Sequence, residues 1–283
     1  MHDDQHGTAI ISSAALLNAL ELAKKKIEKV KIVVSGAGAS ALSCAKLYHS
    51  LGAKIENIFM FDSKGLIHAG REDLDDTKKL FAKHTKTVEF ADAFKKADVF
   101  LGLSRGGLVD KEMILKMAKD PIVFALANPD PEISYKEATS ARKDIIMATG
   151  RSDHPNQVNN VLGFPFIFRG ALDVRAKTIN EEMKLAAVKA IASLAKESIP
   201  EEVIEAYGEK NISFGREQFI PKPLDPRLIY YVAPAVAKAA MDSGVAQTPI
   251  EDWDAYEMEL KNRLGLDNKL IRNITEKGQR SPK

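Results

Sequence analysis

A glycine-rich phrase near the start of the chain restricts the possible folds more than any other feature. Gly36, Gly38 and Ala41 follow an apolar, β-branched run at 31–35 and precede a helical pattern that ends at Gly52. The spacing Gly-x-Gly-x-x-Ala is weak alone, but between a strand and a helix it indicates a dinucleotide site. Gly36 would allow the tight turn and Gly38 the close approach of a pyrophosphate, while Ala41 replaces the third glycine.

Short apolar runs continue to alternate with helical patterns along the chain. After 31–35, strands are predicted at 58–61, 87–89, 99–101, 122–125 and 145–147. Helices are predicted over roughly the first 30 residues and at 36–51, 92–96 and 111–117. Nearly continuous apolar strands between helices are typical of a parallel sheet covered on both faces. The prediction is therefore an α/β fold with a doubly wound, Rossmann-like parallel sheet.

Helices dominate after Gly150. Residues 1–175 are predicted to form the dinucleotide-binding domain with a leading helix, and residues 176–283 a helical extension packed on it. Thr178 and Glu181 have the spacing of a capping box, which would begin a helix running to about 194. Further helices are predicted at 227–241 and 253–264, and a disordered tail from about Thr275.

Composition excludes several classes of partner. The 41 basic and 39 acidic residues leave a net charge of +2, so the chain lacks the basic surplus of a nucleic-acid-binding protein. The single cysteine, Cys44, excludes an internal disulfide and a thiolate metal cluster, and its helical surroundings predict a packing residue. No apolar run reaches the ~20 residues that cross a bilayer. The start at 1–4 is too acidic for a secretory signal, so a cytoplasmic protein without a membrane partner is expected.

Asp62 stands where the second strand ends. At this offset from the glycines, a carboxylate accepts hydrogen bonds from the adenosine ribose, although Asp62 could also be a loop or cap residue. A carboxylate there disfavours a 2′-phosphate, while Lys64 could offset the repulsion. The choice between NAD and NADP therefore stays open. The loop 102–107 follows another strand end and is either a plain turn or part of the ligand crevice.

Three polar clusters lie at the ends of predicted elements. Asp3 and Asp4 precede the first helix, Asn128 follows the strand 122–125, and Asn159 and Asn160 precede an apolar segment. Each cluster alone is more typical of a cap or a turn than of a binding site.

Together these phrases resemble the malic enzymes, particularly the bacterial type. The resemblance is carried by 2–9 (HDDQHGTA), 62–67 (DSKGLI), 124–129 (FALANP), 159–161 (NNV), 214–216 (FGR) and 220–223 (IPKP). These phrases occur in order over nearly the whole chain. The resemblance implies that malate and NAD or NADP give pyruvate, carbon dioxide and reduced cofactor in a homo-oligomer, with Mg²⁺ or Mn²⁺ polarising the substrate oxygen at C2.

The resemblance also implies roles for particular residues. It makes Asp4 a metal ligand with Asp3 beside it, and it places Asn128, Asn159 and Asn160 in the substrate-binding set. Asn128 is also expected to touch the nicotinamide. The catalytic lysine and tyrosine of the family belong to an N-terminal domain, and no segment of this chain matches it. No catalytic residue is therefore assigned, and the chain is expected to be inactive without that domain.

Two other functions are compatible with the fold. The chain could be a stand-alone NAD(P)-binding sensor or assembly module, or it could belong to another amino- or hydroxy-acid dehydrogenase. A sensor has no use for substrate-side groups such as Asp4, Asn128 and Asn160, so their presence favours the enzyme. Another dehydrogenase would fit the fold but not the specific phrases.

Overall fold

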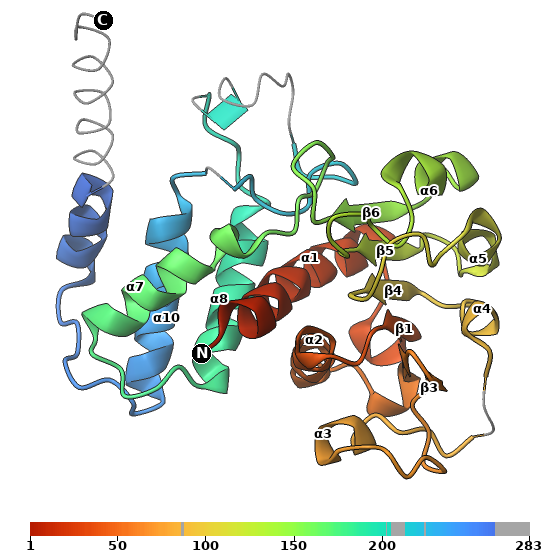
Figure 1. The fold of residues 1–283 in the computed structure, drawn as a ribbon. Helices are drawn as coiled ribbons and strands as arrows, with labels where there is room; N and C mark the ends of the chain where they lie inside the picture. The colour runs from red at the N-terminus through yellow and green to blue at the C-terminus, as the bar shows by residue number, and fades with distance from the viewer. Residues whose placement is uncertain (86–87, 202, 205–212, 224, 264–283) are drawn as a thin grey trace, which may run out of the picture.

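Six strands form one sheet, in the order β3-β2-β1-β4-β5-β6 (Figure 1). The computed structural model describes residues 1–85, 88–201, 203–204, 213–223 and 225–263. The strands are β1 (Ile32–Ser35), β2 (Ile58–Asp62), β3 (Gly65–Leu66), β4 (Val99–Gly102), β5 (Ile122–Ala125) and β6 (Ile146–Thr149). All pairs are parallel except β2 with β3, which is antiparallel. The prediction of a doubly wound parallel sheet is confirmed, and the strand order reverses between β1 and β4.

Helices surround this sheet and extend beyond it. They are η1 (a π-helical turn, Asp3–Gly7), α1 (Thr8–Ala23), α2 (Ala39–Ser50), α3 (Asp76–Lys79), α4 (Phe90–Ala93), α5 (Lys111–Lys116), α6 (Tyr135–Ala141), α7 (Phe164–Asp173), α8 (Glu181–Leu194) and α10 (Leu228–Asp242). Short 3-10 turns are η2 (Ile27–Lys29), η3 (Ile55–Asn57) and η4 (Asn160–Leu162), and residues 253–263 form a further helix. None of the helices in the described ranges is long and apolar enough to cross a membrane.

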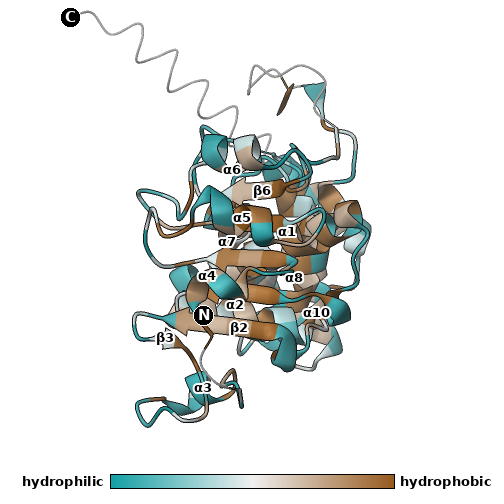
Figure 2. Ribbon diagram, turned by 90° about the vertical axis from the view of Figure 1, so that its right-hand side faces the viewer, coloured by the Kyte–Doolittle hydropathy of each residue, from teal (hydrophilic) through white to brown (hydrophobic). Residues whose placement is uncertain are grey.

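Successive residues of each strand enter two different cores. Val34, Leu101 and Phe124 belong to a large core shared with α1, α2, α7, α8 and α10. Val33, Phe100 and Val123 belong to a smaller core shared with α4, α5 and α6. Figure 2 shows the resulting apolar sheet between helical layers. Burial on both faces explains why these strands read as continuous apolar runs in the sequence.

The predicted strand at 87–89 is wrong for the residues that the structure describes. Val88 and Glu89 are not in a strand, and Thr87 lies outside the described residues. Glu89 instead precedes α4, which begins and ends earlier than the predicted helix at 92–96. The place beside β2 is taken by β3, whose Gly65 has a φ of +106° that allows the chain to turn back antiparallel.

Helix α1 lies at the centre of the larger core rather than at a surface. It packs against α2, α8 and β5, and even its polar residues Ser12, Ser13 and Asn18 are buried. The Asn18 amide donates to the carbonyl oxygens of Ala192 and Phe219, both at 2.9 Å. These two bonds join the leading helix to segments that follow residue 176, so the larger core is continuous across the predicted domain boundary.

The predicted capping box at Thr178 is wrong, because helix α8 begins two residues later. Asn180 is the cap, and its side-chain oxygen accepts from the N–H of Met183 at 3.0 Å. Glu181 cannot reach back, since its carboxylate is held by Ser50 at 2.7 Å and by Lys184 at 2.8 Å. The helices predicted at 227–241 and 253–264 are present within the described residues, and the predicted tail from Thr275 lies outside them.

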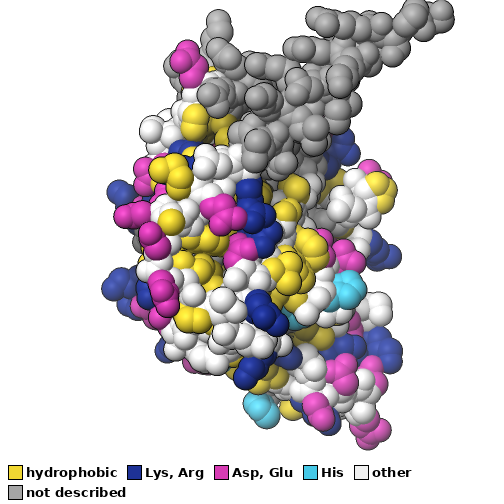
Figure 3. Space-filling model, turned by 90° about the vertical axis from the view of Figure 1, so that its left-hand side faces the viewer, with side chains coloured by type: hydrophobic (Ala, Val, Ile, Leu, Met, Phe, Trp, Pro, Cys, Tyr) yellow, Lys and Arg dark blue, Asp and Glu magenta, His cyan; other side chains and the backbone are white. Residues whose placement is uncertain are grey.

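Apolar side chains reach the surface on the side of the molecule where α7 and the helix 253–263 lie (Figure 3). Leu172 is 63% exposed and Met258 is 60% exposed. The described part of the chain leaves both of these large apolar side chains uncovered.

Candidate functional site

Gly36 makes the turn that follows β1. Its φ is +110°, a conformation that residues with side chains rarely adopt. Its N–H donates to the carbonyl oxygen of Phe61 at 2.8 Å, which ties the turn to β2. A Cβ on Gly36 would lie 2.7 Å from the carbonyl oxygen of Leu103, directly after β4. The turn therefore occupies the switch point between β1 and β4, where doubly wound sheets bind their ligands.

Gly38 caps helix α2 and faces open space. A Cβ on Gly38 would have no atom within 4 Å, and its backbone is extended at φ −78°. No side chain in the described ranges caps α2, so the first N–H groups of this helix are available to an anion. Ala41 is 1% exposed, and a Cβ added to Gly36 would lie 3.7 Å from the Cβ of Ala41. Helix α2 therefore packs closely on the turn after β1 but leaves room for an alanine.

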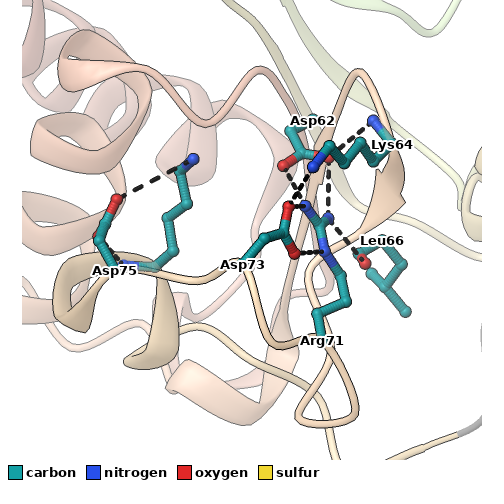
Figure 4. A network of polar contacts seen from close by, with 7 residues as sticks. Asp62, Lys64, Leu66, Arg71, Asp73 and Asp75 are labelled. Carbon is teal, nitrogen blue, oxygen red and sulfur yellow. Dashed lines mark hydrogen bonds and ion pairs between the residues drawn. The ribbon is translucent and has the colours of Figure 1, made fainter.

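Asp62 at the end of β2 is held by Arg71 in a two-point ion pair (Figure 4). Nη1 of Arg71 donates to Oδ1 at 2.9 Å, and Nη2 donates to Oδ2 at 2.8 Å. The backbone N–H of Lys64 adds a third bond to Asp62 at 2.9 Å. Asp73 accepts from Nε of Arg71 at 3.0 Å and from Nζ of Lys64 at 2.7 Å. Two acids and two bases thus form one network of paired charges at the predicted ribose end.

The network fixes the charge of the predicted ribose-binding group. Its hydrogen bonds from Arg71 hold the pKa of the Asp62 carboxyl below its usual range. Hydrogen bonds that Arg71 donates to Asp73 and then to Asp62 raise the pKa of its guanidinium. Asp62 is therefore ionised and oriented before any ligand arrives. Arg71 was not identified from the sequence, because no local pattern distinguishes it from other loop arginines.

The acidic pair Asp3 and Asp4 lies in the π-helical turn η1, which leads directly into α1. The amide of Asn160 donates to the carbonyl oxygen of Asp3 at 3.3 Å, and the Thr8 hydroxyl donates to Oδ1 of Asn160 at 3.1 Å. The Ser40 hydroxyl donates to the carbonyl oxygen of Asp4 at 2.5 Å. The turn is thus tied both to η4 and to the first turn of α2, beside the predicted pyrophosphate site.

A cavity of about 420 Å³ lies beside this turn. Its lining comprises Asp3, Asp4, Thr8, Ser40, Leu103, Leu126, Asn128, Gly150, Val158, Asn159 and Asn160. Every residue that was predicted to hold metal or substrate therefore lies on one cavity. Gly36, Gly38 and Asp62 are outside its lining, and Ser40 and Leu103 connect it to the dinucleotide crevice. Thr8 and Ser40 were not among the predicted site residues.

The asparagines of the cavity differ in how they are held. Asn159 accepts from the N–H of Val161 at 3.0 Å and so caps η4. This is the cap that the sequence offered as the alternative to substrate binding. Asn128 follows β5 and lies opposite Gly150 after β6, where a Cβ would be 3.5 Å from both polar atoms of its amide. Asn128 is exposed, so its amide is accessible to a ligand.

The acidic pair fits part of a site for a hard divalent cation. Oδ1 of Asp3 is buried and has no hydrogen-bond partner in the described part of the chain, which is costly for a carboxylate unless a cation or donor joins it. Carboxylate oxygens are the ligands that Mg²⁺ and Mn²⁺ prefer. A Cβ on Gly7 would lie 2.4 Å from that same oxygen, so a side chain there would displace the Asp3 carboxylate. Among the described residues no three acids, histidines or cysteines are grouped to hold a metal.

Cys44 is a packing residue, as its surroundings in the sequence predicted. It is fully buried between α1 and α2, where it accepts a hydrogen bond from the Ser12 hydroxyl at 3.5 Å. Burial raises the pKa of its thiol to about 12, which excludes a reactive thiolate at neutral pH.

The fold and the switch-point crevice define the class of protein first: a dinucleotide-binding domain of the kind found in nicotinamide-dependent oxidoreductases. The family follows from the sequence. Residues 5–206 match the family described as "Malic enzyme, NAD binding domain", and the chain belongs to it.

Relatives of known name agree with this family. The chain is 58% identical over 261 residues to the NADP-dependent malic enzyme of Haemophilus influenzae. The aligned region is 92% of this chain and 34% of the relative. It is 56% identical to an NAD-dependent malic enzyme of Rhizobium meliloti, over 90% of the chain and 33% of the relative. The crystal structure of the Entamoeba histolytica malic enzyme superposes with a TM-score of 0.87 at 36% identity, over 99% of this chain and 57% of that one. The chain spans about a third of the length of these two curated relatives.

Proposed function

We propose that this chain binds NAD or NADP and contributes the cofactor half of a malic enzyme's active site. The single observation that carries the proposal is the polar cavity beside the N-terminus of α2, which joins Asp4, Asn128 and Asn160 to the dinucleotide crevice. A cavity of this kind serves a small polar substrate next to the cofactor, whereas a cofactor sensor needs only the crevice. The reaction would be oxidation of malate at C2 and loss of its distal carboxylate to give pyruvate.

Different residues of the crevice would bind different parts of the cofactor. The free N–H groups at the start of α2 would bind the pyrophosphate, with Gly38 leaving room for it. The ionised Asp62 would accept hydrogen bonds from the adenosine ribose. Asn128 and Asn160 would donate to carboxylate oxygens of malate, and Asn128 would also contact the nicotinamide, so that C2 faces the ring that accepts the hydride.

Asp4 and Asp3 would hold the divalent metal. Bound Mg²⁺ or Mn²⁺ would polarise the oxygen at C2 and stabilise negative charge that develops during decarboxylation. The cavity lining within the described residues contains no lysine and no tyrosine. We therefore propose that the catalytic lysine and tyrosine belong to the part of the longer relatives that this chain does not span. We also propose a homo-oligomer, to which the apolar side chains of Leu172 and Met258 would contribute buried surface.

The cofactor's phosphorylation state is not decided by the ribose end. Asp62 disfavours a 2′-phosphate, whereas Arg71 and Lys64 would attract one, and these charges balance. The similar identities to NADP-dependent and NAD-dependent relatives are consistent with this balance.

Calorimetric titration of the chain with NADP and with NAD, followed by a malate oxidation assay with Mn²⁺, tests the proposal. We expect binding of at least one cofactor and no turnover by the chain alone, because losing a general acid or base typically costs ~10²–10⁴-fold. Joining the chain to the N-terminal part of a close relative should restore turnover. Binding without any turnover in the joined protein would favour the sensor, and turnover by the chain alone would show that it holds its own catalytic groups.

A further inference from the structure

Glu132 is a fully buried carboxyl group behind the cofactor crevice. It is 0% exposed and follows the loop 126–131, which leaves β5 and carries Asn128. In the described part of the chain its carboxyl forms no ion pair, and its hydrogen bonds come from backbone N–H groups. The charged residues of the two adjoining loops, Arg105 and Asp130, are both exposed. A buried acid without a counter-ion is uncommon and needs a structural or functional reason.

The partners of this carboxyl are backbone N–H groups from two different loops. The N–H of Ser104, after β4, donates to Oε1 at 3.0 Å. The N–H of Ala127, after β5, donates to Oε2 at 3.1 Å, and the N–H of Leu126 also stabilises the charged form. Both carboxyl oxygens are therefore acceptors, and each one holds a different loop.

The two loops held by Glu132 form part of the wall of the proposed site. Leu103, Leu126 and Asn128 line the cavity, and each lies within one residue of a bond to Glu132. The Ser104 hydroxyl lies 2.7 Å from that of Ser35, so the same link reaches the end of β1, next to the Gly36 turn. Glu132 thus connects the carboxyl ends of β1, β4 and β5.

Room for the carboxyl comes from Gly102, the last residue of β4. A Cβ on Gly102 would lie 2.3–2.6 Å from all three atoms of the Glu132 carboxyl. The loops also bond to each other directly, from the N–H of Gly107 to the carbonyl oxygen of Pro131 at 3.1 Å. The sheet end is therefore built around a carboxyl group rather than around apolar packing.

We propose that the Glu132 carboxylate is a positioning residue, which holds the loops after β4 and β5 in the shape that binds the dinucleotide. It touches neither cofactor nor substrate and acts through Leu103, Ser104 and Asn128. This inference rests on the proposed dinucleotide site, and it adds a residue that neither the sequence patterns nor the family resemblance singled out.

A positioning role and a purely structural role predict different responses to loss of the charge. Burial raises the pKa of Glu132, so ionisation costs the folded state free energy. Stability from this group is thus greatest when it is neutral and declines as pH rises through the raised pKa. Cofactor affinity should change in the opposite direction, because a protonated carboxyl carries a donor where the N–H groups of Ser104 and Ala127 both require acceptors. For a purely structural residue, stability and affinity would fall together.

The test compares Glu132→Gln with the matched control Glu112→Gln, in which an exposed glutamate on α5 loses the same charge. Each variant of the full 283-residue chain is titrated with NADPH and NADH by nucleotide fluorescence and melted without ligand. Loss of hydrogen bonds to a charged acceptor should raise the dissociation constant of Glu132→Gln about tenfold or more. Its melting temperature should stay level or rise. The control should change neither quantity.

Several results would overturn the inference. Unchanged affinity in Glu132→Gln, or affinity and melting temperature that fall together, would leave Glu132 with only a structural role. If the variant does not fold, the wild-type chain still tests the inference by NMR. The amide protons of Ser104 and Ala127 should titrate together as the pH is lowered, and cofactor affinity should be lost at the same midpoint; separate titrations would refute the link. A wild-type chain that binds neither nucleotide would instead refute the proposed function, and the two amide protons would still report on Glu132.

Discussion

Gly36 and Gly38 stand two residues apart and should respond to substitution in opposite ways. A side chain on Gly38 enters open space, since a Cβ there has no atom within 4 Å and φ is −78°. Gly38→Val should therefore cost only the difference between glycine and valine as a helix cap, about 0.5–1 kcal/mol. For a chain of this size, that lowers the melting temperature by roughly 1–4 °C. Valine would, however, occupy the approach path of the pyrophosphate and abolish cofactor binding.

Gly36→Ala should destabilise the fold much more. The φ of +110° costs an alanine roughly 1–2 kcal/mol. The new Cβ at 2.7 Å from the carbonyl oxygen of Leu103 forces backbone to move, which adds about 1–3 kcal/mol. The melting temperature should fall by roughly 4–20 °C. Gly65→Ala is the matched control, because its φ is +106° but a Cβ there meets no atom within 4 Å, so only the backbone strain is added.

Differential scanning calorimetry of the three variants measures the stabilities, and titration calorimetry with NAD and NADP measures the affinities. Wild-type affinity in Gly38→Val would show that no pyrophosphate passes this position. If Gly36→Ala is no less stable than Gly65→Ala, the loop after β4 moves aside without a cost in stability. That result would contradict the close packing at the switch point.

Three further predictions concern acids. Asp62→Asn should weaken NAD binding and, because Arg71 loses a counter-charge, raise the affinity for NADP relative to NAD in calorimetric titrations; an unchanged ratio would contradict the proposed ribose contact. In a protein that joins this chain to the N-terminal part of a close relative, Asp4→Asn should abolish malate oxidation at limiting Mn²⁺ with little change in nucleotide affinity, since an amide binds a hard dication poorly. Near-normal activity there would show that Asp4 does not hold the metal. Arg142 lowers the pKa of Asp144 to about 2, so this carboxylate should stabilise the fold above pH 4 and lose that contribution between pH 4 and 2. Urea unfolding of Asp144→Asn and wild type should therefore converge over that interval, and a constant difference would refute the linkage.

The strands were predictable because their burial is encoded locally. In a parallel sheet covered on both faces, every residue of a strand is apolar, so 32–34, 58–61 and 122–125 stand out without knowledge of their neighbours. The glycine spacing was equally local, since Gly36 needs its φ whatever surrounds it. The resemblance to a known family added which acids and amides to look for. Their proposed contacts with metal and substrate stay predictions.

The local sequence was insufficient where two alternatives fitted it equally well. Thr178 and Asn180 are both good caps, and the choice depended on Ser50 and Lys184, which hold the carboxylate that the capping box required. The run 87–89 was predicted as a short strand, but the edge of β2 was already taken by β3. In both places a distant residue decided between two conformations of similar local free energy.

The sequence by itself therefore determined the class of fold, the glycine turn and the identity of the polar clusters, because backbone conformation and apolar periodicity are local properties. Only the tertiary structure brought Asp3 to Asn160 across 157 positions, paired Arg71 with Asp62, and enclosed Glu132 beneath two loops. Such contacts depend on which strand ends meet at the edge of the sheet. The local sequence around a charged residue does not identify the residue that it pairs with at that edge.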